Sequence, residues 1–79
     1  MLKKLQQLRI KNKLSYEEMA KKVNLSKAYY WQIEHGDRKL SYQNAITISK
    51  VFNLKPDDIF YEDYTKSLEK WFFYIVIYK

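Results

Sequence analysis

The segment LSYEEMAKKVNLSKAYYWQIEHG, residues 14–36, constrains the fold more strongly than any other part of the chain. It contains two short stretches with apolar residues at helical spacing, each opened by a serine. It ends at Gly36, the only glycine of the chain. Serine caps helix N-termini, and glycine ends helices because it readily adopts the left-handed conformation. The segment therefore predicts two short helices joined by a tight turn.

Local signals place the ends of both helices. Ser15 and Glu18 form a capping box, in which each side chain accepts a hydrogen bond from the backbone N–H of the other residue. Asn24 follows the first helix, and asparagine tolerates the left-handed backbone that such a turn needs. Ser26 caps the second helix. The expected inward-facing residues are Met19, Ala20, Val23, Tyr30 and Ile33.

Three further helices are expected around this pair. Residues 2–12 carry leucines at helical spacing between basic residues, which predicts an amphipathic first helix. Ser41 caps a fourth helix, and Pro56 with two following aspartates begins a short fifth helix that reaches Phe60. The inner face of the fourth helix is expected to hold Ala45, Ile46, Ile48, Val51 and Phe52. The predicted fold class is all-α, with five helices.

Residues 61–79 form a C-terminal tail of different composition. Residues 61–70 are polar and are interpreted as a linker or a short helix. The apolar run at 71–78 is aromatic and β-branched and lacks strong helix formers, which favours a β-strand. A helical tail is the alternative, since one helix face would hold Leu68, Trp71, Phe72 and Ile75.

Leaving this apolar run exposed to water would be unfavourable, so the tail needs a partner. One interpretation pairs it with residues 1–4 of its own domain. We favour a homodimer instead, because the strand is apolar on both faces and an edge strand is a template for a second chain. The expected dimerisation residues are Trp71, Phe72, Phe73, Tyr74, Ile75, Val76 and Ile77.

The charge of the chain is concentrated in one half. Residues 1–39 hold ten Lys or Arg and four Asp or Glu, whereas residues 40–79 hold five of each. The entire net charge of +6 therefore lies in the half that contains the helix pair. A one-sided basic surface is typical of proteins that bind nucleic-acid phosphates.

Other features exclude several classes of protein. The 79 residues suffice for one domain, and 47% hydrophobic content predicts a real core. The chain has no cysteine, which excludes disulfides and thiolate metal sites and is consistent with a cytoplasmic protein. We find no signal-peptide pattern, and the longest apolar run has eight residues, whereas a membrane span needs about 20. A soluble protein without a membrane partner is expected.

No catalytic pattern is present in the sequence. We find no glycine-rich phosphate loop, no Ser/His/Asp set and no carboxylate pair in an acid–base context. His35 is the only histidine and is interpreted as a polar residue at a helix end, not as a metal ligand. We therefore expect no enzyme activity, no metal, no cofactor and no small-molecule ligand.

At residues 2–60 the pattern resembles the Cro/cI-type (XRE family) helix-turn-helix transcriptional regulators. The resemblance rests on Leu14-Ser15, Glu18-Met19-Ala20, Val23, Leu25-Ser26, Tyr30, Ile33-Glu34, Gly36 and the LKPDDIF segment at 54–60. Asn24 departs from the usual turn glycine, Tyr16 from the commoner glutamine, and Tyr30-Trp31 is bulkier than usual. The resemblance implies a lambda repressor-like DNA-binding domain at 1–60, with the helix-turn-helix at 16–35.

The resemblance also implies roles for individual residues. In this family a glutamate at position 34 pairs with an arginine of the first helix, which here is Arg9, and their role is structural. The second helix of the motif enters the major groove. Its expected base-reading residues are Lys27, Ala28, Tyr29 and Gln32, with Trp31 also facing outward. The expected phosphate contacts are Tyr16, Ser26, Arg38, Lys39, Gln43 and Asn44.

The sequence therefore predicts a regulator that binds double-stranded DNA, most simply a repressor acting as a homodimer on a palindromic operator. Its expected location is the cytoplasm, at the nucleoid of a prokaryotic or phage system. One alternative is an antitoxin-like or antirepressor-binding module, in which the tail captures a regulatory protein partner. A second alternative is an architectural protein that binds DNA without sequence preference.

Overall fold

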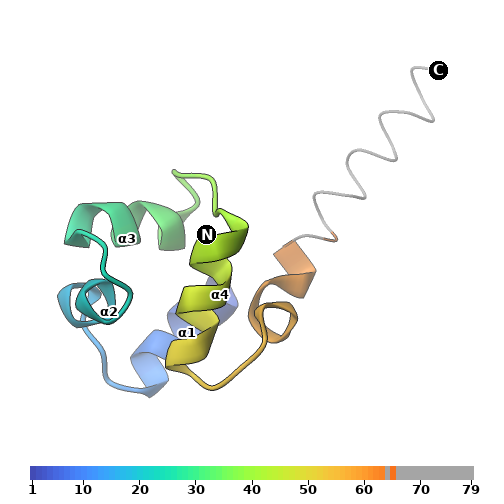
Figure 1. Ribbon diagram of the computed structural model, residues 1–79, viewed down its shortest axis with the longest axis horizontal. Coiled ribbons are helices and arrows are strands. Elements are labelled where there is room, and N and C mark those ends of the chain that lie inside the picture. Colours follow the sequence, from blue (N-terminus) through green and yellow to red (C-terminus); the bar gives the residue numbers. More distant parts are fainter. Residues whose placement is uncertain (64, 66–79) are drawn as a thin grey trace.

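The computed structural model describes residues 1–63 and 65, and all regular secondary structure in these residues is helical. The helices are α1 (Lys3–Lys11), α2 (Tyr16–Lys22), α3 (Lys27–His35) and α4 (Tyr42–Val51). A fifth helix begins at residue 56. Figure 1 shows α2 and α3 together at one end of the domain, with the fifth helix at the other end. The all-α fold with five helices is confirmed, whereas the expected strand at 71–78 and the dimerisation residues at 71–77 lie outside the described residues.

The predicted caps are present at the start of three helices. The Ser15 hydroxyl accepts from the Glu18 N–H at 3.0 Å, and the Glu18 carboxylate accepts from the Ser15 N–H at 3.1 Å. The Ser26 hydroxyl caps α3 through the Tyr29 N–H at 3.1 Å. Ser41 caps α4 in the same way, at 3.1 Å from the Asn44 N–H. These bonds satisfy backbone donors that a helix N-terminus otherwise leaves unpaired.

Left-handed residues end or follow the first four helices. Gly36 has φ of 79°, and the adjacent Asp37 N–H donates to the Gln32 carbonyl at 2.9 Å. Asn24 has φ of 57°, which confirms the turn expected after α2. Lys13 and Asn53 adopt the same conformation, with φ of 56° each. Lysine at such a position carries a steric cost that glycine or asparagine largely avoids.

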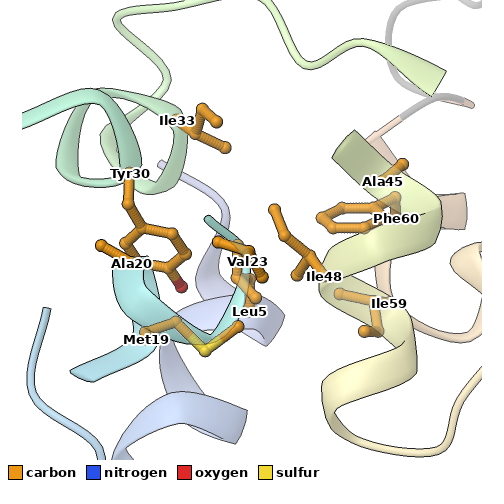
Figure 2. Close-up of a cluster of buried hydrophobic side chains, with 10 residues drawn as sticks. All are labelled: Leu5, Met19, Ala20, Val23, Tyr30, Ile33, Ala45, Ile48, Ile59 and Phe60. Carbon is orange, nitrogen blue, oxygen red and sulfur yellow. The ribbon is translucent and has the colours of Figure 1, made fainter. Parts of the chain in front are cut away.

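One hydrophobic core joins all five helices (Figure 2). The expected core residues of α2 and α3 are buried, and Ala20, between these two packed helices, is only 2% exposed. A small residue there lets the two helices approach closely. The core consists of Leu5, Met19, Ala20, Val23, Tyr30, Ile33, Ala45, Ile48, Ile59 and Phe60.

The fifth helix extends beyond Phe60. The sequence predicts a short helix that reaches Phe60 and leaves residues 61–70 open as a linker or a short helix; residues 61–63 and 65 are helical and continue the fifth helix. The helix is anchored at its start, where the Asp58 carboxylate accepts from the Lys55 N–H at 2.9 Å. It is also held by Ile59 and Phe60, which are 2% and 1% exposed. No proline or glycine follows to end it.

Candidate DNA interface

Helix α3 has an inner and an outer face. Tyr30, Ile33 and Glu34 are buried at 0% exposure and hold the helix against the domain. The outer residues are Lys27, Ala28 and Trp31, which are exposed, and Tyr29 and Gln32, which are half-buried. Of the expected base-reading residues, Lys27 and Ala28 are exposed and Gln32 is half-buried, whereas Tyr29 also packs against the edge of the core.

A buried ion pair fixes α3 to α1. Arg9 Nε donates to Glu34 Oε2 at 2.9 Å, and Arg9 Nη2 donates to Glu34 Oε1 at 3.1 Å. The Glu34 side chain is fully buried, and that of Arg9 is 8% exposed. Two parallel hydrogen bonds of this kind define both distance and orientation. The structure thus brings together the two residues that the family resemblance implied.

Arg9 also contacts the turn before α2 and the first residue of α2. Its Nη1 donates to the Leu14 carbonyl at 2.8 Å, and its guanidinium lies 4.0 Å from the Tyr16 ring centroid. Burial opposes the charge of Arg9, but the hydrogen bond and the negative charge of Glu34 outweigh it and raise the Arg9 pKa. Arg9, a residue of α1, therefore contacts both α2 and α3.

The hydroxyl of Tyr30 is buried beside this ion pair. Among the described residues it has no hydrogen-bond partner. Burial, followed by the negative charge of Glu34, raises the Tyr30 pKa far above its ordinary value. The phenol therefore stays neutral, and its contribution to the core is mainly its ring.

Tyr16, an expected phosphate contact, also packs against aromatic side chains of α3. It is half-buried, and its ring lies 5.9 Å from the His35 ring and 6.5 Å from the Tyr30 ring. With the guanidinium of Arg9 against it, this ring has a structural role that the sequence did not reveal. The sequence signal for this role was the bulky tyrosine at position 16, where the family commonly has glutamine.

Trp31 and His35 pack as a pair on α3. Their rings are stacked, with centroids 3.7 Å apart and planes inclined by 15°. His35 Nδ1 also lies 2.8 Å from the Trp31 carbonyl oxygen. Within residues 1–63 and 65, no group of histidine and acidic side chains is placed to hold a metal ion.

Arg38 follows α3 and folds back onto its outer face. Its Nε donates to Gln32 Oε1 at 3.0 Å, and its guanidinium lies 4.2 Å from the Tyr29 ring centroid. The structure therefore joins a residue expected to contact phosphate with two residues expected to read bases. Sequence reasoning missed this link, because it depends on the path of the loop at Gly36–Asp37.

The other expected phosphate contacts lie at the starts of α3 and α4 and, for Lys39, in the loop between these helices. Ser26, Lys39 and Gln43 are exposed, and Asn44 is half-buried. Tyr42, which the sequence reasoning did not select, is the first residue of α4 and is 73% exposed. Helix N-termini favour anions through their free N–H groups and dipoles, so these positions suit phosphate binding.

The fold and this outer face define a helix-turn-helix DNA-binding protein. A family model described as helix-turn-helix matches residues 5–59. The chain therefore belongs to that family, that of the Cro/cI-type (XRE) transcription regulators, which are DNA-binding and generally non-enzymatic. Searches of curated proteins and of solved structures found no match. No helix in the described part of the chain is long and apolar enough to cross a membrane.

Proposed function

We propose that this regulator represses transcription by binding a palindromic operator as a homodimer, with α3 in the major groove. The observation that carries the proposal is that α3 has a buried inner face and a solvent-accessible outer face. The Arg9–Glu34 pair fixes how the helix is presented, and the outer face carries side chains able to contact base edges.

The chemistry of the outer face suits direct readout. Lys27 can donate to guanine O6 and N7, and the Ala28 methyl group can contact the methyl group of thymine. Gln32 and Tyr29 offer hydrogen-bonding groups on the same face. Each well-placed side chain of this kind discriminates between base pairs by about 1–3 kcal/mol.

Contacts to phosphates would fix the register of the helix without carrying sequence information. We assign these contacts to the residues that flank α3 and to the beginnings of α2 and α4. The set comprises Tyr16, Ser26, Arg38, Lys39, Gln43 and Asn44. Each cation that neutralises a phosphate adds to the salt dependence of binding.

A two-fold dimer would place two copies of α3 on half-sites about 34–36 Å apart. We assign the dimer contact to residues 71–77, because this apolar segment needs a partner and is long enough to form a strand. We place the protein in the cytoplasm, on the DNA it regulates.

Selection from random duplex DNA with the purified chain tests the proposal. At about 0.15 M salt, where long-range charge interactions are screened, we expect an inverted repeat to be recovered. Lys27→Ala should change the recovered sequence. Lys50→Ala, which removes an exposed lysine at the far end of α4, is the matched control and should leave the sequence unchanged.

Two results would contradict the proposal. Folded protein that recovers no motif would favour a protein that uses the tail to capture a protein partner, or an architectural DNA-binding protein. A motif without two-fold symmetry would exclude the palindromic operator. Measurement of the molecular mass in solution, with and without residues 71–79, would then show whether the tail forms the dimer contact.

A further inference from the structure

The residues Tyr29, Gln32 and Arg38 form a cluster on the outer face of α3. Arg38 is held at two points, by its hydrogen bond to Gln32 Oε1 at 3.0 Å and by the Tyr29 ring, 4.2 Å from its guanidinium. A cation over an aromatic ring and a charge-assisted hydrogen bond are both favourable, and together they define one position for the guanidinium.

This contact decides the orientation of the Gln32 amide. Arginine nitrogens only donate hydrogen bonds, so the atom facing Arg38 Nε must be the amide oxygen. The amide nitrogen of Gln32 is then fixed on the opposite side of the group. A free glutamine side chain can turn its amide over, and the two orientations present different patterns of donors and acceptors to a base pair.

We propose that Arg38 is a positioning residue for base recognition, which holds Gln32 in one amide orientation and so sharpens the sequence preference at one base pair of each half-site. In this arrangement Gln32 touches the base, and Arg38 acts through it. Hydrogen bonding to a cation also polarises the amide and makes its N–H groups better donors.

Because the inference rests on the proposed function, the test starts from the operator sequence recovered with the unaltered protein. Binding is measured for all four base pairs at every operator position. We expect Gln32→Ala to remove discrimination at one position, an effect of about fivefold or more. Arg38→Ala should reduce discrimination at that same position, by about threefold or more, and leave the profile unchanged at positions that neither Gln32 nor Tyr29 reads.

Lys39→Ala is the matched control, since it removes a neighbouring exposed cation, whereas the hydrogen bond to Gln32 Oε1 comes from Arg38. It should weaken binding to all sequences equally and lower the salt slope by about 1. The double variant Arg38→Ala/Gln32→Ala should discriminate no worse at the affected position than Gln32→Ala alone, because both changes act on one contact. Arg38 is exposed, so its removal should leave the helical circular dichroism unchanged.

The possible failures are distinct. If the unaltered protein recovers no motif, the proposed function and this inference are both wrong. If it recovers a motif but Arg38→Ala lowers affinity uniformly, as Lys39→Ala does, Arg38 is only a phosphate contact and the inference alone is wrong. Loss of discrimination at a position that neither Gln32→Ala nor Tyr29→Phe affects would also overturn it, because Arg38 would then read a base itself.

Discussion

Replacement of Glu34 by glutamine should strongly destabilise the domain. The substitution keeps the shape of the side chain but removes the negative charge, while Arg9 stays buried and positively charged. Removing one partner of a buried pair costs about 3–5 kcal/mol, since the remaining charge is uncompensated. We expect a value near 3 kcal/mol, because the amide oxygen can still accept one of the two hydrogen bonds now made to Arg9.

That loss is large relative to the whole stability of so small a domain. For 79 residues the free energy of unfolding is expected to be about 4–12 kcal/mol. A loss of about 3 kcal/mol corresponds to a fall in Tm of about 12–24 °C. Urea unfolding followed by circular dichroism measures the change directly as a lower midpoint at unchanged slope.

Two companion variants separate charge from packing. Arg9→Met/Glu34→Leu removes both charges and should recover most of the stability, because apolar replacement of a whole buried pair is often neutral. Glu17→Gln removes an exposed carboxylate from α2 and should change stability by less than about 0.5 kcal/mol. The reasoning is refuted if Glu34→Gln is as harmless as Glu17→Gln, or if the double variant is less stable than Glu34→Gln.

Three further predictions concern single residues. Tyr30→Phe should change the free energy of unfolding by less than about 1 kcal/mol in urea titration, because the buried hydroxyl has no partner among the described residues; a larger loss would reveal a bond to Glu34. Lys13→Gly should raise stability by about 0.5–1 kcal/mol, since φ of 56° suits glycine better than lysine, and an unchanged or lower Tm would contradict this. The Ser15 N–H lowers the Glu18 pKa, so the ionised capping box stabilises the fold at neutral pH and loses this contribution as the pH falls below about 4.3. The urea midpoints of the unaltered protein and Glu18→Gln should therefore converge in acid, and a constant difference from pH 7 to pH 3 would argue against the titration.

Local signals in the sequence were sufficient for most of the fold. The serines at 15, 26 and 41 and the glycine at 36 placed the helix ends, because capping depends on neighbours in the chain. The continuation of the fifth helix beyond Phe60 was left open between a linker and a short helix, since residues 61–70 carry no capping signal and no strong apolar pattern. Propensity alone is a weak guide in such a segment.

The site was only partly predictable. The outward position of Lys27 and Gln32 follows from helical periodicity, and the Arg9–Glu34 pair came from the family resemblance. The fold of Arg38 over Tyr29 could not be foreseen, because it depends on the loop geometry and on the rotamers of three side chains. Contacts across a loop leave no periodic pattern in the sequence.

The division of α3 into two faces has an evolutionary consequence. Stability depends on Tyr30, Ile33 and Glu34, whereas Lys27 and Ala28 make little contact with the core. Exchanges at the outer positions can therefore accumulate at little energetic cost. Proteins that carry this domain can acquire a new target sequence through substitutions on the outer face of α3, while selection for folding preserves the residues of the inner face. Coupling between Arg38 and Gln32 would make those two positions change together.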